Sequence, residues 1–177
     1  MLVLLAVLMM ALPACRAAAP DGGVVVGAAR TDAYLPLLKG KRVALFSNQT
    51  GVVGDRHVLD VLLDHGVNVV TIFSPEHGFR GKADAGEKVS SSVDAKTGTP
   101  IYSLYGAKGG APDDEEMGKF DVLVSDIQDV GLRFYTYYIT MVKLMDRCAE
   151  YGKLMVVLDR PNPNGFYVDG PILDMRF

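Results

Sequence analysis

The stretch VNVVTIFSPEHGFRG, residues 67–81, shows how this chain is built. Its first half, VNVVTIF, is rich in β-branched and apolar residues, which is typical of a buried strand. The loop that follows places an acid, a histidine and a base close together, as Glu76, His77 and Arg80. A buried strand followed directly by a loop with ionisable side chains is the pattern that we look for in the rest of the sequence.

The same pattern recurs along the chain. Further strands are expected at 42–46, 100–106, 120–127 and 153–159. Helices are expected just before Gly40, at 55–66, at 112–118 and at 135–152. The strands are nearly continuous apolar runs, which indicates burial on both faces, and strands alternate with helices. The sequence therefore predicts an α/β fold with a Rossmann-like, open, mostly parallel sheet and helices on both faces.

The longest expected helix, residues 135–152, carries an apolar stripe that we interpret as core packing. The stripe consists of Tyr138, Met141, Val142, Met145, Cys148 and Ala149. Cys148 is accordingly expected to be a buried thiol and not a nucleophile.

Polar clusters follow most of the expected strands. They are SNQTG (47–51), SPEHGFRG (74–81), SDIQDVGLRFYTY (125–137) and DRPNPNG (159–165). The carboxyl ends of parallel strands meet at one edge of a sheet, where ligands bind, so we expect these clusters to form one site. We call this edge the rim. The candidate ligand-binding residues are Asn48, Arg80, Asp84, Asp126, Gln128, Asp129, Arg133, Tyr135, Tyr137, Asp159, Arg160 and Asn162.

The residue types at the rim favour an acidic, hydroxyl-rich ligand. Arg80, Arg133 and Arg160 can bind a carboxylate or phosphate bidentately. Tyr135 and Tyr137 can form a platform for a sugar, although aromatic residues at this place also serve packing. Any one of the arginines can equally be part of a structural ion pair.

Composition excludes several classes of function. The chain has 177 residues, 49% of them hydrophobic, which suffices for one domain with a core. Its net charge is −3 and no block of Lys or Arg is present, so a nucleic-acid partner is not expected. No dinucleotide or phosphate-binding glycine motif follows a strand, so we expect no nucleotide cofactor.

The spacing of the histidines does not favour a metal site. His57 and His65 lie on one expected helix, where we interpret them as solvated. His77 could join Asp84, Asp126 and Asp159 in an oxygen-rich metal site, but no H-x-x-x-H or paired-cysteine spacing supports one.

Acid–base catalysis by a carboxylate is the chemistry that these observations leave for the site. Glu76 follows Pro75 at a strand end and could act as a general acid. The structural alternative is an N-cap partner or a surface ion pair, and position alone favours neither.

The N-terminus has the pattern of an export signal. Residues 1–15 are apolar and uncharged, too short to span a bilayer but suited to the apolar core of a signal peptide. The alternative is a buried strand or helix. LPAC (12–15) resembles a lipobox, which would make Cys15 a lipidated N-terminus and the membrane partner of the protein; CRAAAP (15–20) equally suits ordinary cleavage. We expect a signal peptide at 1–19, a linker and the start of the first helix at 20–37, and the domain at 38–177. The protein should then be exported to the periplasm, the cell envelope or the medium.

From about Leu38 to Leu173 the motifs resemble a known family in order and spacing. SNQTG, SPEHGFRG with DAGE (84–87), DIQDVGLRFYTY, LDRPNPNG and GPIL (170–173) are similar to the bacterial exo-β-N-acetylmuramidase (NamZ-like) family. The resemblance implies a glycoside hydrolase that removes terminal β-1,4-linked N-acetylmuramic acid from the non-reducing end of peptidoglycan fragments. It places the catalytic glutamate at Glu76 and makes His77 part of the same motif.

The resemblance also implies what lies around the site. Family members have a Rossmann-like domain and a smaller second domain, with the active site between them, and this chain matches the first part only. We therefore expect the second domain to be missing, the rim to be over-exposed and hydrolysis by this chain to be low. The second catalytic group stays open between Asp126, Asp129, Asp159 and the acetamido group of the substrate. A non-catalytic module that binds muropeptides or acidic sugars is the alternative function, and a metal-dependent hydrolase is the third.

Overall fold

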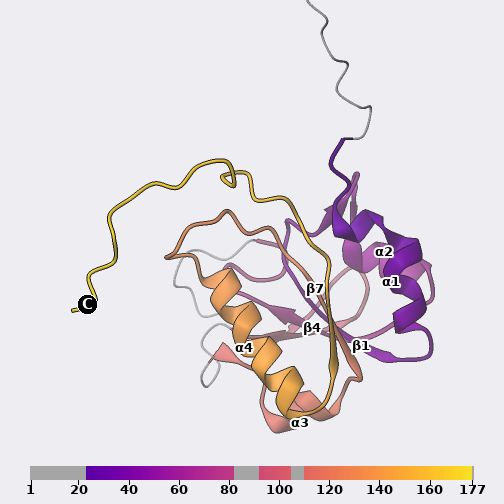
Figure 1. Cartoon of the computed structure of the whole chain (residues 1–177). Helices are drawn as coiled ribbons and strands as arrows, with labels where there is room; N and C mark the ends of the chain where they lie inside the picture. The colour runs from indigo at the N-terminus through magenta and orange to yellow at the C-terminus, as the bar shows by residue number, and fades with distance from the viewer. Residues whose placement is uncertain (1–22, 82–91, 105–109, 177) are drawn as a thin grey trace, which may run out of the picture.

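The computed structural model describes residues 23–81, 92–104 and 110–176. The main sheet has the strand order β5-β6-β4-β1-β7-β8. Its strands are β1 (Arg42–Ser47), β4 (Asn68–Ser74), β5 (Ser92–Val93), β6 (Pro100–Ser103), β7 (Val122–Asp126) and β8 (Leu154–Val157). All neighbours pair in parallel except β5, which runs antiparallel to β6. The predicted Rossmann-like α/β fold is confirmed (Figure 1).

The order of the strands locates a binding crevice. From β1 the chain winds outward through β4 to β6, then crosses back to β7 and β8 on the other side of β1. β1 pairs with both β4 and β7, so the winding direction reverses between β1 and β7. In open α/β sheets, the carboxyl ends of the strands at such a reversal border the ligand crevice.

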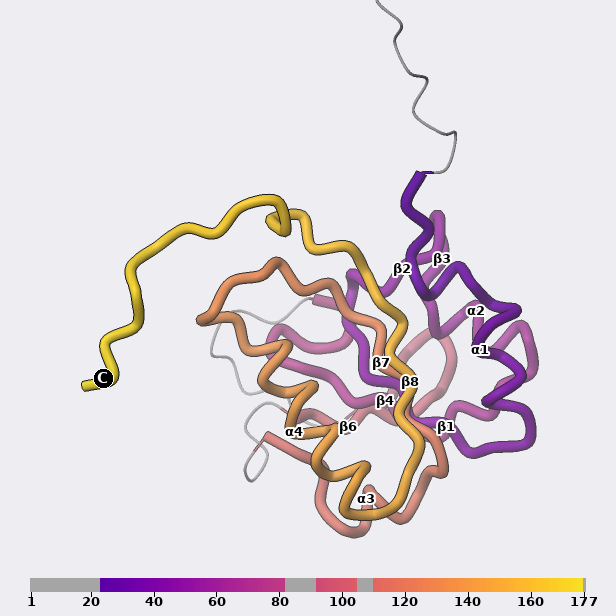
Figure 2. The backbone as a smooth tube through the Cα atoms, in the orientation of Figure 1, coloured from indigo at the N-terminus to yellow at the C-terminus, as the bar shows by residue number. Residues whose placement is uncertain are grey.

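Two layers of helices cover the sheet (Figures 1 and 2). The helices are η1 (Gly27–Ala29), α1 (Thr31–Leu38), α2 (Val58–Asp64), α3 (Asp114–Gly118) and α4 (Thr136–Glu150). The central strand β1 serves both layers, because its side chains alternate between the faces. Val43 and Leu45 pack in one core cluster with α1 and α2, whereas Ala44 and Phe46 pack in a second cluster with α3 and α4.

The start of α2 differs from the prediction. A short hairpin, β2 (Val52–Val53) and β3 (Arg56–His57), precedes α2, and Gly54 makes its turn with φ +61°. Its second strand, β3, occupies the first residues of the expected helix. His57 pairs with Val52 and is 8% exposed. The prediction of a solvated helical His57 is therefore wrong, because the hairpin carries this side chain under the rim.

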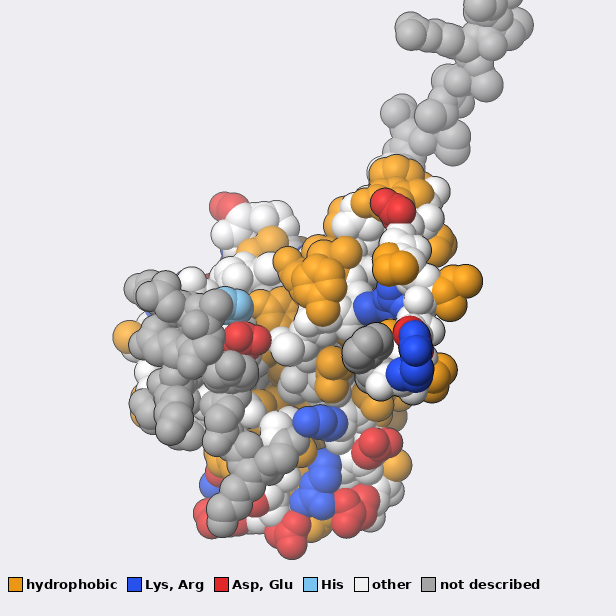
Figure 3. Space-filling view, turned by 90° about the vertical axis from the view of Figure 1, so that its left-hand side faces the viewer, with side chains coloured by type: hydrophobic (Ala, Val, Ile, Leu, Met, Phe, Trp, Pro, Cys, Tyr) orange, Lys and Arg blue, Asp and Glu red, His pale blue; other side chains and the backbone are white. Residues whose placement is uncertain are grey.

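The apolar stripe on α4 is only partly buried. Leu144 and Cys148 are buried, and Met141 packs against the same cluster. Tyr138, Val142 and Met145 are instead 37%, 48% and 48% exposed, and Ala149 is exposed too, so the prediction of these four as core residues is wrong. They belong to a second face of the helix, turned away from the row of Met141, Leu144 and Cys148. Hydrophobic side chains are also exposed on the face of the molecule shown in Figure 3.

Several sequence expectations fall outside the described residues. These are the signal peptide at 1–19, Cys15 and Asp84. Within residues 23–81, 92–104 and 110–176, no helix combines the length and the apolar character needed to cross a membrane.

Residues near the start of the described chain pack against the sheet, where the Gly27 amide donates to the Asp159 carbonyl at 2.7 Å.

Candidate active site

A tight turn at the end of β4 presents Glu76. The Gly78 amide donates to the Pro75 carbonyl at 3.1 Å and closes the turn. His77 has φ +69°, the one non-glycine residue with positive φ in the described part of the chain. An L-residue in this conformation costs roughly 1–2 kcal/mol. Strain of this kind persists only where the surrounding structure fixes it, as at binding sites.

Glu76 lies in a small pocket at the start of α4. The pocket has a volume of about 270 Å³ and is lined by Glu76, His77, Phe134, Tyr135, Thr136 and Tyr137. The Thr136 hydroxyl donates to Glu76 Oε2 at 3.2 Å. This contact joins two loops that are 60 residues apart in sequence. The predicted convergence of the strand-end clusters therefore holds for these two loops.

Aromatic rings form one wall of this pocket. The rings of Tyr135 and Tyr137 meet edge to face with 6.3 Å between their centroids. Burial raises the pKa of the Tyr137 phenol, and Asn48 opposes that rise. Asn48 is fully buried at the end of β1, and no acceptor in the described residues meets its Nδ2 at good hydrogen-bonding geometry.

Beneath the rim, Asp126 and Arg160 form a buried ion pair. Arg160 Nε donates to Asp126 Oδ1 at 2.6 Å, and Arg160 Nη2 donates to Asp126 Oδ2 at 2.9 Å. The Asp126 and Arg160 side chains are 0% and 6% exposed. Burial raises the pKa of the Asp126 carboxyl, and the contact with Arg160 opposes this rise. Both oxygens of Asp126 are thus occupied by the protein itself.

His57 completes this buried layer. Its Nδ1 accepts from the Leu59 amide at 3.1 Å, so its Nε2 carries the proton and donates to the Asn48 carbonyl at 2.8 Å. Burial lowers the pKa of His57, and the hydrogen bond to Asn48 opposes that effect. We name Asp126, Arg160, His57 and Asn48 the buried network: they form two hydrogen-bonded pairs, and the charge of Asp126 also acts on His57.

Arg80 is also paired. It donates to both oxygens of Asp94 at 2.9 Å, and Asp94 is 3% exposed. Desolvation works to raise the pKa of Asp94, but hydrogen bonds from Thr97 and Arg80 outweigh it and lower that pKa. The Arg80 guanidinium lies over the Phe79 ring at 4.7 Å. In this structure Arg80 therefore braces the loop after β4 against residues 94–97.

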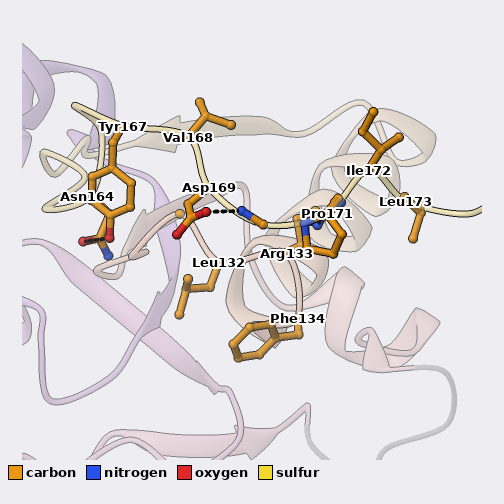
Figure 4. A pocket seen from close by; sticks show the side chains of 12 residues that line it. Leu132, Arg133, Phe134, Asn164, Tyr167, Val168, Asp169, Pro171, Ile172 and Leu173 are labelled. Carbon is orange, nitrogen blue, oxygen red and sulfur yellow. Dashed lines mark hydrogen bonds between the residues drawn. The ribbon is translucent and has the colours of Figure 1, made fainter.

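Arg133 has a different environment. Its Nη2 donates to the Pro171 carbonyl at 2.9 Å, and no carboxylate pairs with it in the described residues. It borders a cavity of about 860 Å³ between residues 131–134 and 164–173 (Figure 4). This cavity is larger than the Glu76 pocket, and the two have Phe134 in common.

The other predicted residues mostly hold the loops together. Gln128 donates to the Asp129 and Pro161 carbonyls, at 2.6 and 3.0 Å. Asn162 accepts from the Asn164 amide at 2.9 Å and packs against Gly131. Asp129 Oδ2 accepts from the Gly131 amide at 3.0 Å, whereas Oδ1 is buried without a partner in the described residues. Asp159 is exposed.

Sequence reasoning missed two features of the site. Thr136 is not among the predicted residues, although a hydroxyl between two predicted site tyrosines is a usable signal. Nothing in the sequence distinguishes His57 as a buried residue, because the hairpin that carries it has only two residues per strand. For a metal, the described residues contain no group of three or more His, Cys, Asp or Glu that could hold one.

Comparisons with known proteins agree with the resemblance found in the sequence. Residues 43–177 match the family described as exo-beta-N-acetylmuramidase NamZ, N-terminal. Peptidoglycan beta-N-acetylmuramidase NamZ of Bacillus subtilis (strain 168) is 46% identical over 147 residues, which cover 81% of this chain and 35% of that protein. The chain thus spans about a third of the length of this curated relative.

Two crystal structures of DUF1343 family proteins from Bacteroides fragilis NCTC 9343 share the fold. One superposes with a TM-score of 0.75 at 59% sequence identity, and the match covers 88% of this chain and 40% of the Bacteroides chain. The other superposes with a TM-score of 0.71 at 40% sequence identity, and the match covers 82% of this chain and 37% of the Bacteroides chain. The chain belongs to the NamZ exo-β-N-acetylmuramidase family and corresponds to its N-terminal part.

Proposed function

We propose that this chain carries the catalytic part of an exo-acting glycoside hydrolase, with Glu76 as its general acid. The substrate is a peptidoglycan fragment whose non-reducing end is a β-1,4-linked N-acetylmuramic acid. One observation carries the proposal: the Glu76 carboxyl accepts a hydrogen bond from Thr136 in a pocket walled by Tyr135 and Tyr137. A relative that covers most of this chain is named a peptidoglycan beta-N-acetylmuramidase.

The chemistry follows from the position of Glu76. The protonated carboxyl gives its proton to the glycosidic oxygen as the bond between that oxygen and the anomeric carbon breaks. Water then adds its hydroxyl to the anomeric carbon, and its remaining proton passes to the Glu76 carboxylate in a retaining reaction or to the second carboxylate in an inverting one. The tyrosine rings can stack against the sugar, and the Tyr137 hydroxyl can hydrogen-bond to its polar groups.

The structure narrows the search for the second catalytic group. Asp126 is unsuited to that role, because both its oxygens accept from Arg160 below the rim. Asp129, Asp159 and the substrate's own acetamido group remain. Carboxyl groups about 5–5.5 Å apart in a substrate complex would indicate retention, and a separation of about 6.5–9.5 Å would indicate inversion.

An exported location belongs to the same proposal, because peptidoglycan lies outside the cytoplasmic membrane. We propose a periplasmic or cell-envelope lipoprotein anchored at Cys15, or a secreted protein after ordinary cleavage. Metabolic labelling with a fatty acid, for the full chain and its Cys15→Ala variant, tests this: label on the full chain alone supports the anchor. Unlabelled chain that has lost residues 1–19 supports secretion instead.

The test of function measures release of N-acetylmuramic acid from a disaccharide in which it is β-1,4-linked to N-acetylglucosamine. The assay uses this chain and a fusion that continues it with the remaining part of the Bacillus subtilis relative. Glu76→Gln should lower the rate by about 10²–10⁴-fold, whereas Glu115→Gln, on the exposed surface of α3, should leave it unchanged. An unchanged rate in Glu76→Gln contradicts the role of Glu76. Binding without release in both proteins favours the alternative, a module that binds acidic sugars.

A further inference from the structure

The rim offers three arginines to an anionic ligand, and two of them are already neutralised. Arg160 and Arg80 each bind both oxygens of one buried aspartate. Arg133 is exposed, and its guanidinium makes a single hydrogen bond within the described residues, to the neutral Pro171 carbonyl at 2.9 Å. A guanidinium has five N–H donors, so most of those on Arg133 are available to a ligand.

The surroundings of Arg133 concentrate its charge. Apolar side chains line much of the cavity beside it, among them Leu132, Phe134, Tyr167 and Ile172 (Figure 4). The cavity contains one acidic residue, Asp169, whose Oδ1 accepts from the Gly170 amide at 2.6 Å. Asp169 forms no ion pair with Arg133 within the described residues. An anion is therefore the ligand group that this cavity favours most.

The cavity adjoins the Glu76 pocket. Phe134 lines both, and Arg133 and Thr136 are only three residues apart on the segment that leads into α4. A sugar ring over Glu76 can therefore extend an acidic substituent toward Arg133.

We propose that Arg133 is the specificity-determining residue of the site and binds the carboxylate of an acidic amino sugar. The inference rests on the proposed function for the identity of that sugar: N-acetylmuramic acid differs from N-acetylglucosamine by a lactyl ether with a free carboxylate. Arg133 would bind that carboxylate bidentately. The lactyl methyl group would lie against the apolar lining of the cavity.

The experiment measures binding, so it does not depend on hydrolysis. The chain is titrated by calorimetry with N-acetylmuramic acid, with its methyl ester, and with N-acetylglucosamine. The ester keeps the shape of the acid but lacks its charge. The wild-type chain should bind the acid on the order of 5-fold more tightly than the ester, the upper range for an ion pair at an exposed site.

Substitutions then assign the preference to one side chain. Arg133→Gln should abolish the preference for the acid over the ester, and Arg133→Lys should keep part of it. Lys41→Gln removes the same charge at the amino end of β1, on the opposite edge of the sheet, and should leave the preference intact. Urea unfolding of each variant identifies any that fails to fold, in which case Arg133→Lys carries the test.

Three results would overturn the inference: no preference for the acid in the wild-type chain, a preference that survives Arg133→Gln, or equal weakening of the acid and the ester by that substitution. The last would mean that Arg133 only holds residues 170–171 in place. Glu76→Gln should retain the preference even where it abolishes hydrolysis. A chain that prefers the acid but never releases it would refute the proposed hydrolysis and leave the carboxylate site standing.

Discussion

The buried network and the rim contain the same kinds of residue, yet they differ in what those residues can do. In the buried network, the Asp126 carboxylate and the Arg160 guanidinium satisfy each other within the protein. At the rim, Glu76 Oε2 accepts from the Thr136 hydroxyl, and Arg133 donates to a backbone carbonyl. Residue type alone therefore does not separate a structural pair from a binding group. The difference lies in which partner the fold brings to each side chain.

The buried network should contribute strongly to stability. Replacing one partner of a buried ion pair leaves the other charged and desolvated, which costs about 3–5 kcal/mol. We expect Asp126→Ala to lower the free energy of unfolding in urea by this amount. Asp121→Ala is the matched control, because Asp121 pairs with Arg42 on the surface, where the two side chains are 37% and 48% exposed. The control should have a small effect, and equal effects would contradict the structural role of burial.

The second prediction concerns Gly51, which packs closely against the buried network. A Cβ at Gly51 would lie 2.2 Å from Ser47 Oγ and 3.1 Å from Asp126 Oδ2. Gly51→Ala should therefore destabilise the chain by about 1–3 kcal/mol, as overpacking does. Gly118→Ala is the control, because a Cβ at Gly118 would have none of the described atoms within 4 Å beyond its own helix and chain neighbours. Chemical unfolding of both variants makes the comparison, and a neutral Gly51→Ala would show that the network can relax.

The pH dependence of stability should report on His57. Burial lowers the pKa of His57 below its ordinary value of 6.5. Below pH 6.5 the unfolded chain therefore binds a proton that the folded chain does not, and stability falls as the pH falls. We expect His57→Gln to be less stable at pH 7 but to lose less further stability as the pH is lowered below 6.5. Parallel slopes for the two proteins would contradict a neutral, buried His57.

The smallest expected effect concerns the strained turn at the rim. His77→Gly should relieve the cost of φ +69°, offset by the greater freedom of glycine in the unfolded chain. The net gain should be no more than about 1 kcal/mol over His77→Ala, which keeps the strain. Both variants lose the imidazole, so their difference in unfolding free energy isolates the backbone. A His77→Gly variant that is less stable than His77→Ala by about 0.5–1 kcal/mol, the full cost of glycine, would mean that the turn is not strained.

The fold could be predicted because its signals are local. Continuous apolar runs such as VNVVTIF and the alternation of strands with helices determine a parallel α/β sheet. Short elements carry little signal, which is why the sequence predicts a helix from residue 55, where the structure has the end of a hairpin. The error on α4 has a related cause: apolar spacing predicts a helix, but it does not state which of two apolar faces meets the core.

The candidate site could be predicted as a place but not as a set of roles. That strand-end residues gather at the rim follows from parallel topology, and Glu76 meets Thr136 as that rule implies. Whether an arginine finds a buried aspartate depends on contacts such as Arg80 with Asp94 and Arg160 with Asp126, which are 14 and 34 residues apart. Pairing at such separations is set by the packed structure, so the sequence leaves all three arginines equivalent.

The same substitution at two arginines tests this account most directly. The free energy of unfolding in urea is measured for Arg160→Gln and Arg133→Gln. Arg160→Gln should lower it by about 3–5 kcal/mol, because it leaves Asp126 buried without its counter-ion. Arg133→Gln should change it by less than about 0.5 kcal/mol, as is usual for an exposed residue whose contacts in the described structure include no ion pair. Equal losses in the two variants would contradict the division between a buried network that stabilises the fold and a rim that is open to ligand.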